Sequence, residues 1–386
     1  MRGAVSKSID ELDRDQWNAL AGCEVPFLRH EFLAALEHTG CVGSATGWIP
    51  SHVTLSDDRG LAAAAPAYVK THSYGEFVFD FSWAQAYMRF GRRYYPKLTI
   101  AVPFTPATCS RLLVRPDLDR NQTARRLVAA IESRAREVSL SSMHALFIED
   151  GDRAVFEHAG WLARRVCQFH WTNHDYASFD AYLESFTAEK RKKARRERRR
   201  VAEAGIVFET LLGPDIPPRL MDRIYEFHRD TFLRHGHEPY LTRDFFGEIT
   251  RTLGDALMVK VALHHGRPVA AAIFFWCQAA LYGRYWGSEA DYHSLHFEAC
   301  YHQGVEFCIE RGIQRFEPGT QGEHKVSRGF EPTFTWSAHS ITDARFRDAI
   351  RDYLEREGAA IEAYAAEVQT HVPYRERRTG NDEGCA

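Results

Sequence analysis

An alternating pattern of apolar and polar residues occurs twice in the chain, in residues 52–79 and in residues 259–287. Each segment contains two alternating runs joined by a glycine turn, at Gly60 and at Gly266, and then a third apolar run. Alternation with a period of two, interrupted by glycine turns, predicts a three-stranded antiparallel meander. The turn glycines lie 206 positions apart (266 − 60), which indicates duplication of a whole domain. A chance likeness between two hairpins is the alternative.

Helical and strand-like patterns follow each meander. Apolar residues that recur every three or four positions predict helices, and short apolar runs between turn residues predict strands. The elements expected outside the meanders are an aromatic stretch over 83–95, strands over 98–102, 145–148, 165–170, 206–210, 313–316 and 333–339, and helices over 120–138, 178–186, 187–204, 294–311 and 343–368.

Strands interleaved with helices, with antiparallel pairs at the front of each half, predict an α/β (α+β) fold. We expect tandem modules over residues 1–172 and 173–386, each a mixed, mainly antiparallel sheet flanked by helices. In this arrangement the run at Tyr74-Gly75 corresponds to the run at Tyr282-Gly283. The first module has no equivalent of the polar loop over 317–328, so we expect it to be structural.

Composition places the chain among ordinary globular proteins. Of its 386 residues, 45% are hydrophobic and 26% charged, and the net charge of −3 leaves no global attraction to nucleic acid or membrane. No apolar run approaches the roughly 18–20 residues of a spanning helix, so we expect no transmembrane segment and a cytoplasmic location. The eight cysteines are scattered without a CxxC pair, which predicts neither a disulfide framework nor a metal site.

One local cluster of charge departs from this balance. Residues 190–200 read KRKKARRERRR, where only Ala194 and Glu197 are not basic. The cluster predicts one helix with positive charge on every face, in which like charges four residues apart repel. Phosphates of an RNA, a phosphorylated small molecule or a lipid head group would compensate; a solvated face balanced by acidic neighbours is the alternative. The candidate polyanion-binding residues are Lys190, Arg191, Lys192, Arg195, Arg196 and Arg199.

The third strand of the second meander combines an arginine with large aromatic residues. Alternation sends Tyr282, Arg284 and Trp286 to one face of the sheet, and Leu281 and Tyr285 to the other. An arginine between aromatic rings, flanked by glycines that allow close approach of a ligand, is typical of a groove. An edge strand whose aromatic residues pack under a loop is the alternative.

A helix start rich in titratable residues follows this strand. Glu298 and His302 are four positions apart and share a helix face, whereas His296 lies apart from that pair. The HExxH spacing of a zinc site is absent, so we favour a general base or a polar anchor over a metal ligand.

A glycine-rich loop over 317–330 follows the short strand expected over 313–316. The loop contains Lys325 and Arg328, which are three positions apart and would share a face of a short helix. Such a pair clamps one anionic group, and sites in α/β sheets often follow strands. A surface turn with solvated charges is the alternative.

The residues of the second half resemble the Fem-like N-acyltransferases, the peptidoglycan-bridge or peptidoglycan-biosynthesis-like branch of the GNAT superfamily. The resemblance rests on KRKKARRERRRVAEAGI, LYGRYWG, HFEACYHQGVEFCIERG and FEPGTQGEHKVSRGFEPT, and extends over nearly the whole chain. It implies two GNAT-type modules in tandem and peptide bond formation from an activated acyl donor. The donor stays open between aminoacyl-tRNA and acyl-CoA, because the (Q/R)xxGx(G/A) loop typical of CoA binding and the long coiled-coil arm of some Fem proteins are both absent.

Either donor requires the same chemistry, in which an amine loses its proton to a base and N–H donors stabilise an oxyanion. Backbone N–H groups beside Tyr285-Trp286 are the expected oxyanion donors. We expect no tightly bound cofactor and an amine-bearing small molecule or peptide as acceptor, with tRNA as a possible partner. A non-catalytic module that binds RNA or another polyanion is the alternative. The candidate catalytic residues are Glu298, Glu317, His296 and His324, and the candidate substrate-binding residues, which should converge with them on one cleft, are Arg284, Tyr285, Trp286, Lys325 and Arg328.

Overall fold

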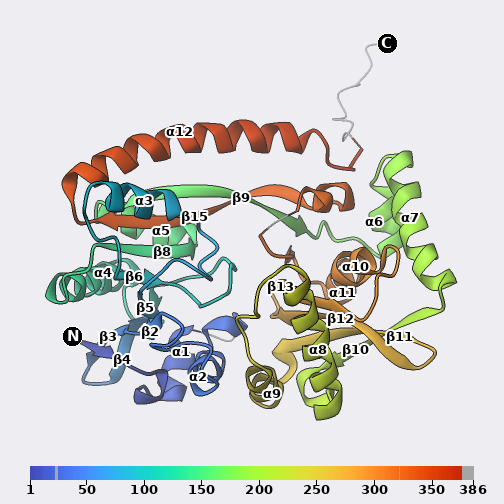
Figure 1. Cartoon of the computed structure of the whole chain (residues 1–386), viewed down its shortest axis with the longest axis horizontal. Helices are drawn as coiled ribbons and strands as arrows, with labels where there is room; N and C mark the ends of the chain where they lie inside the picture. The colour runs from blue at the N-terminus through green and yellow to red at the C-terminus, as the bar shows by residue number, and fades with distance from the viewer. Residues whose placement is uncertain (22–24, 321, 376–386) are drawn as a thin grey trace, which may run out of the picture.

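The computed structural model describes residues 1–21, 25–320 and 322–375. Two sheets lie in it (Figure 1). The four-stranded sheet has the order β1 (Arg2–Ser6), β3 (His52–Asp57), β4 (Gly60–Ala65) and β7 (Leu113–Val114). The eleven-stranded sheet has the order β10 (Ile206–Leu212), β11 (Leu257–His264), β12 (Arg267–Trp276), β13 (Ala280–Ser288), β14 (Arg315–Glu317), β9 (Leu162–Thr172), β15 (Glu331–Ile341), β8 (Ser142–Ile148), β6 (Lys97–Ile100), β5 (Ala67–Lys70) and β2 (Trp48–Pro50).

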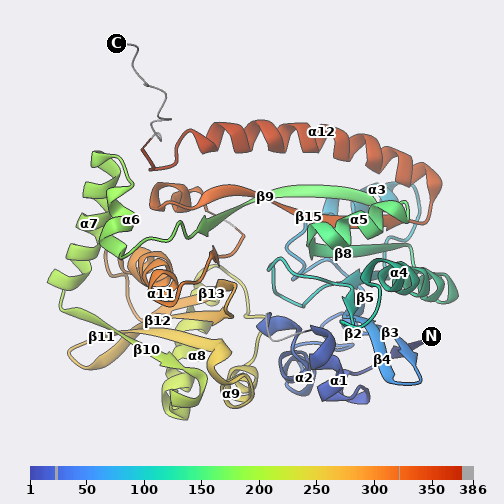
Figure 2. The same cartoon turned by 180° about the vertical axis from the view of Figure 1, so that it is seen from behind.

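Helices cover both sheets (Figures 1 and 2). A π-helical turn over Glu298–His302 joins α10 to α11, where one continuous helix was expected. None of the described helices combines the length and hydropathy that a bilayer-spanning segment requires. The helices are α1 (Arg14–Ala21), α2 (His30–His38), α3 (Phe81–Arg89), α4 (Arg120–Glu137), α5 (Asp150–His158), α6 (Phe179–Glu184), α7 (Ala188–Glu203), α8 (Pro218–Arg234), α9 (Arg243–Thr252), α10 (Leu295–Phe297), α11 (Gln303–Arg311) and α12 (Ala344–Gln369).

The two halves repeat one strand order. β1, β3, β4 and β7 are antiparallel neighbours, as are β10, β11, β12 and β13. The hairpin of each half carries a register shift close to its turn, after Leu55 in the first and after Ala262 in the second. The corresponding order and the corresponding shift agree with the duplication that the spacing of the two glycine turns predicts.

The prediction of a third strand at Tyr74-Gly75 in the first half is wrong. Residues 71–79 form no strand, and Tyr74 lies exposed in a turn. The strand that follows Pro66, β5, leaves the hairpin and pairs with β6 and β2 in the larger sheet. β7 takes the place beside β4 that we assigned to the run at Tyr74-Gly75.

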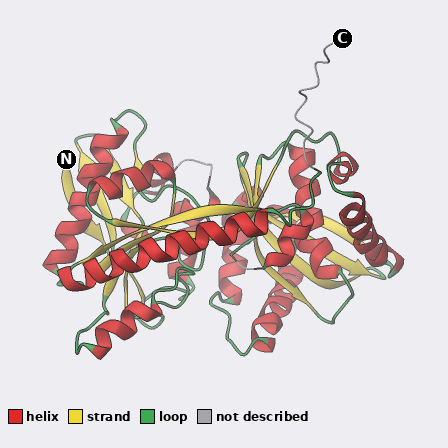
Figure 3. Ribbon diagram, turned by 90° about the horizontal axis from the view of Figure 1, so that it is seen from above, coloured by secondary structure: helices red, strands yellow, loops and turns green. Residues whose placement is uncertain are grey.

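The halves share strands across the middle of the chain. β15 lies between β8 and β9, so a C-terminal strand completes the sheet of the first half. β9 pairs with β15 over most of its length and with β14 at Trp171-Thr172. From above, the longest helix, α12, runs from one half to the other along these strands (Figure 3). The division at residue 172 stays a prediction; it falls on the last residue of β9.

Some sequence features lie outside the described residues. These are Cys23, Cys385 and residues 376–386, which make up all but the first residue of the polar tail that the sequence shows over 375–386. Gln321, within the glycine-rich loop, is also outside.

Candidate functional site

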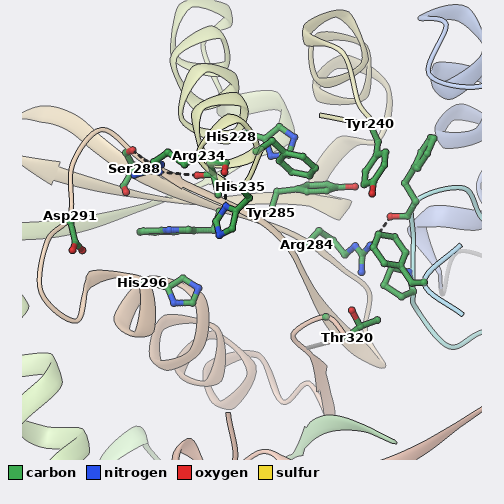
Figure 4. Close-up of a pocket in the computed structure, with 17 residues that line it drawn as sticks. His228, Arg234, His235, Tyr240, Arg284, Tyr285, Ser288, Asp291, His296 and Thr320 are labelled. Atoms are coloured by element: carbon green, nitrogen blue, oxygen red, sulfur yellow. Dashed lines mark hydrogen bonds between the residues drawn. The ribbon is translucent and has the colours of Figure 1, made fainter. Parts of the chain in front are cut away.

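A cavity of about 840 Å³ opens between the two halves (Figure 4). Its walls come from β13, α8, the start of α10 and loops of the N-terminal half, so neither half encloses it alone. A smaller cavity of about 120 Å³ continues it between β12 and the π-helical turn. The larger cavity is lined by Phe77, Phe104, Pro106, His228, Thr231, Phe232, Arg234, His235, Tyr240, Arg284, Tyr285, Trp286, Ser288, Asp291, His296, Gly319 and Thr320.

The cavity begins where the sheet divides. β13 pairs with the parallel strand β14 only from Ala280 to Tyr282, and beyond that point the described residues contain no strand on this edge of β13. A register shift between β12 and β13 makes Arg284 the extra residue of a β-bulge, because Ile273 faces Tyr285 while Phe274 faces Gly283. A bulge leaves its extra residue outside the ladder and redirects side chains. The strand edge and the bulge together face the opening.

The bulge also overturns the predicted faces of this strand. Tyr282 and Tyr285 pack together with the cluster under α8 and α9. Leu281 and Trp286 pack on the opposite face, against α11 and the π-helical turn. Strict alternation had put Trp286 with Tyr282, and the prediction is wrong because the extra residue at Arg284 shifts the side-chain period by one.

Gly287 brings α8 onto this strand. A Cβ atom built on Gly287 would lie 2.1 Å from the carbonyl carbon and oxygen of Phe227 and 2.6 Å from the backbone nitrogen of His228. Only a residue without a side chain allows this approach. The contact sets the His228 ring against that of Tyr285, with ring centroids 4.9 Å apart.

Of the three histidines that line the cavity, His228 comes from α8 and His296 from the start of α10 (Figure 4). His228 is buried, and neither of its ring nitrogens has a hydrogen-bond partner within the described residues. His296 lies against Trp286, with ring centroids 5.5 Å apart. Burial lowers the pKa of His228 to about 4. Burial, helped by the nearby His324, Arg328 and Lys325, lowers the pKa of His296 to about 4. Both imidazoles are therefore neutral at pH 7.

Arg284 spans the gap between the halves. Its guanidinium donates to the backbone carbonyl of Phe104 at 2.8 Å and contacts the phenol of Tyr285. Its Nε atom is buried without a partner, and no carboxylate of the described residues lies within ion-pair distance of it. Burial lowers the pKa of the guanidinium. Arg284 thus presents an uncompensated positive charge at the cavity wall.

Three predicted site residues do not meet in the cavity. Glu298 is buried against Arg198, which donates to it at 3.1 Å, and Gln303 donates to the same oxygen at 2.8 Å. Glu317 accepts from Arg315 at 2.8 Å. Lys325 donates to the carbonyl of Gly319 at 2.6 Å, and burial lowers its pKa to about 7. The predicted convergence of Glu298, Glu317 and Lys325 is wrong, because each of the two buried carboxylates is paired with a different arginine.

The remaining predicted residues of the loop serve local contacts. Arg328 is buried and forms a two-pronged ion pair with Glu197 of α7, at 2.7 and 3.1 Å. The ring of His324 bonds to the phenol of Tyr301 at 2.8 Å. Burial lowers the pKa of His324. Of the predicted residues, those that line the cavity are Arg284, Tyr285, Trp286 and His296.

The basic cluster forms one helix, α7, as predicted, but its charge is not on every face (Figure 2). Ala194, Glu197 and Val201 form its buried side. Several arginines pair locally: Arg191 and Arg195 with Glu184, Arg198 with Glu298 and Glu306, and Arg199 with Glu203. Lys190, Lys192, Lys193 and Arg196 have no ion pair within the described residues, so these four keep their charge for a ligand.

The sequence analysis missed the cavity residues outside β13 and α10. His228 and Arg234 belong to α8, whose pattern is that of an ordinary amphipathic helix, and His235 follows its last residue. Phe77 and Phe104 come from irregular segments of the N-terminal half. The glycine at 287 was the one available signal, because it marks a close backbone approach in a strand.

The family model for FemAB-like proteins, described as peptidoglycan biosynthesis/recognition, matches residues 8–376. The chain belongs to the FemAB-like family. No curated protein matches its sequence.

Solved structures share the fold of this FemAB-like chain. The C-terminal domain of a putative lysylphosphatidylglycerol synthetase from Agrobacterium fabrum superposes with a TM-score of 0.53 at 13% identity, covering 95% of this chain and 100% of that one. L-PGS from Bacillus licheniformis gives 0.52 at 12% identity, with 89% and 97% covered. FemX gives 0.52 at 11% identity, with 91% and 100% covered. At these identities the likeness establishes the fold alone, and the expected α/β fold with mixed, mainly antiparallel sheets flanked by helices is confirmed.

Proposed function

We propose that this FemAB-like chain is an N-acyltransferase that forms an amide bond in the cavity between its halves. The observation that carries the proposal is the open edge of β13 at the bulge, with the neutral His296 beside it. Membership of a family described as peptidoglycan biosynthesis/recognition supports the same reaction class.

The main chain of β13 supplies the oxyanion donors in this proposal. Attack of an amine on an activated acyl carbon puts negative charge on the carbonyl oxygen, and fixed N–H donors stabilise that charge without reorganising. In an antiparallel pair every second peptide group points away from the partner strand. Beyond Tyr282 such groups of β13 face no strand in the described part of the chain. We assign the donors to residues 283–286.

His296 takes the proton of the amine. The C–N bond forms first, and the bond from the acyl carbon to the ester oxygen or thioester sulfur then breaks. The nitrogen of the tetrahedral intermediate is far more acidic than a free ammonium ion, so a weakly basic imidazole can remove its proton. The low pKa of His296 keeps the ring ready to accept at neutral pH. The imidazolium of His296 then gives this proton to the leaving oxygen or sulfur, so the alcohol or thiol departs neutral and the imidazole is regenerated.

The donor in this proposal is aminoacyl-tRNA or acyl-CoA, and no tightly bound cofactor takes part. The acceptor is an amine-bearing small molecule or peptide, of which a peptidoglycan peptide is the member that the family suggests. Asp291 lies exposed on the cavity rim without an ion pair among the described residues, and it suits the approach of a cationic amine. Arg284 suits an anionic group of either substrate.

Mass spectrometry of an amine-bearing peptide tests the proposal. The protein is incubated with the peptide and, separately, with a charged tRNA pool or acetyl-CoA. We expect a mass gain equal to one acyl group with one of the two donors. Absence of transfer with both donors would contradict the proposal. His296→Asn should depress transfer by about 10²–10⁴, and His293→Asn, a histidine of the same segment outside the cavity lining, is the matched control.

A non-catalytic role is the second candidate, and α7 favours it. Three of its four basic residues without an ion pair among the described residues, Lys192, Lys193 and Arg196, are exposed and suit an RNA backbone or another polyanion. Tight tRNA binding without transfer from any donor would favour this candidate over the acyltransferase.

A further inference from the structure

Exposed apolar side chains gather in one short segment of the N-terminal half. Of the twelve large hydrophobic side chains that are exposed among the described residues, five lie between positions 74 and 90. The rings of Tyr74 and Phe81 lie 5.7 Å apart, and those of Phe79 and Phe81 stack at 6.1 Å. Single exposed apolar residues are ordinary, but a contiguous group marks an interaction site. The five and their exposed fractions are Tyr74 (63%), Phe79 (56%), Phe81 (38%), Met88 (71%) and Phe90 (76%).

Helix α3 presents part of this group on one face. Met88 and Arg89 follow Phe81 by seven and eight positions, which places the three on the same face of the helix, and all three are exposed. Trp83 and Tyr87 lie on the inner face and are buried. The ring of Tyr87 stacks on Phe346 at the start of α12, with centroids 3.8 Å apart, so the inner face packs on α12.

The charges of the segment are of one sign. Arg89, Arg92 and Arg93 are exposed, and none forms an ion pair within the described residues. The acidic residues of positions 72–96 are Glu76 and Asp80, and both are buried around Lys97, at 2.8 and 2.5 Å from its ammonium group. The surface of the segment therefore offers apolar and positive groups without a negative one of its own.

A shallow hollow of about 520 Å³ adjoins α3 and could receive an anionic group. Arg92 and Arg93 line it together with the hydroxyl residues Ser139, Ser141 and Thr342. Asp343 also lines the hollow, but its carboxylate accepts a hydrogen bond from the backbone N–H of Arg345 at the start of α12. Ser141 and Thr342 donate their hydroxyl protons to backbone carbonyls, so the two arginines and Ser139 are the groups of this hollow that suit a phosphate.

We propose that residues 74–93, the α3 surface, dock on a lipid bilayer that carries anionic head groups. The exposed aromatic side chains and Met88 insert at the boundary of head groups and acyl chains, and the three arginines pair with lipid phosphates. The exposed charges of the segment itself are all positive, which favours an anionic bilayer over a protein partner, whose interface would need matched polar groups at its rim. The proposal does not depend on the acyltransferase reaction.

Docking would place the substrate cavity at the bilayer. Phe77, within the same segment, lines the cavity. Tyr74 lies near the cavity residue Tyr240. Burial raises the pKa of Tyr240, and the nearby phenol of Tyr74 raises it further. A cavity mouth next to the docked surface gives access to an acceptor or donor held in the membrane.

Sedimentation with vesicles tests the proposal. The full-length protein is mixed with vesicles of phosphatidylcholine alone or with about 30% phosphatidylglycerol. We expect binding to the anionic vesicles that falls with added salt. The variant R89Q/R92Q/R93Q should bind about 100-fold more weakly, since each arginine near an anionic surface contributes about five-fold.

A second variant separates apolar insertion from charge. F81S/M88S/F90S keeps the arginines, and we expect it to lose at least ten-fold in binding while circular dichroism stays unchanged, because the three side chains are exposed. The control K192Q/K193Q/R196Q removes from α7 three exposed charges that have no ion pair among the described residues, and it should bind as the wild type does. Equal binding to both vesicle types, or unchanged binding of both α3 variants, would overturn the proposal. Loss of binding in the α7 control alone would assign the membrane contact to α7, and no binding at all would leave the α3 surface to a protein partner.

Discussion

Replacing Gly287 by alanine should push α8 away from β13. The added Cβ would lie 2.1 Å from the backbone of Phe227, whereas ordinary contact begins at 3.4 Å. The helix must therefore move by about 1.3 Å (3.4 − 2.1), and backbone atoms cannot rotate aside as a flexible side chain can. Overpacking of this kind costs about 1–3 kcal/mol. We expect a loss near the upper end, about 3 kcal/mol, because the obstacle is a helix backbone.

Urea denaturation followed by circular dichroism measures this loss. Gly247 of α9 provides the matched control, because a Cβ there would meet only the Arg251 side chain, at 3.7 Å. Gly247→Ala should stabilise the protein by up to about 1 kcal/mol through helix propensity. A loss below about 1 kcal/mol for Gly287→Ala would refute the close-packing argument.

Gly287→Ala should also change the geometry of the cavity. His228 and Tyr285 sit on either side of the contact, so a shift of α8 moves one wall relative to the bulge. Misplacement of about 1 Å can cost about 100-fold in rate. We therefore expect kcat/KM to fall by about that factor in Gly287→Ala and to stay unchanged in Gly247→Ala. Full activity of Gly287→Ala would place the chemistry elsewhere.

Three further predictions follow from the described contacts. His296→Asn should lower kcat by about 10²–10⁴ with little change in KM, measured in the transfer assay. The folded-state pKa of Lys325 lies near 7, below its unfolded value, so the unfolded state binds more protons between these pKa values and stability rises with pH there. Urea titrations from about pH 7 to about pH 9 should show the wild type gaining about 2 kcal/mol relative to Lys325→Met; an equal pH profile would contradict the shift. The α7 variant K192Q/K193Q/R196Q should weaken tRNA binding and flatten its salt dependence, and an unchanged salt slope would return α7 to a solvated helix.

Local periodicity predicted most elements correctly, since each depends on nearby residues. The helices over 120–138 and 343–368 and the strand over 206–210 are found as α4, α12 and β10 within a few residues. The run at Tyr74-Gly75 failed because its acidic residue, Glu76, and the nearby Asp80 turn inward to neutralise Lys97. Burial would raise the pKa of Asp80, yet the Lys97 ammonium group outweighs it and holds the pKa below its usual range.

Long-range pairing was beyond the sequence pattern. A period of two cannot reveal that β15 inserts between β8 and β9, because either partner satisfies the same alternation. The alternation also cannot reveal the bulge at Arg284. The bulge consists of a single residue of β13 that has no partner in β12. Glu298 looked like a base because its partner, Arg198, lies 100 positions earlier in a helix that appeared to be all surface.

The sequence pattern predicted one wall of the cavity and missed the other. The aromatic strand with its arginine and the histidine at the helix start both line the cavity, because their residue types suit few roles in a core. The other wall comes from α8 and from irregular loops of the first half, and only the packing of the two halves brings these residues to the strand.

A crystal structure of the protein with the amide product of its active donor tests the central claim most directly. The account predicts the product in the cavity between the halves, with its amide carbonyl oxygen accepting a hydrogen bond from the main chain of β13 between residues 283 and 286. Its amide nitrogen should face the imidazole of His296. Product bound along α7, or in the cavity with its carbonyl turned away from β13, would contradict the account.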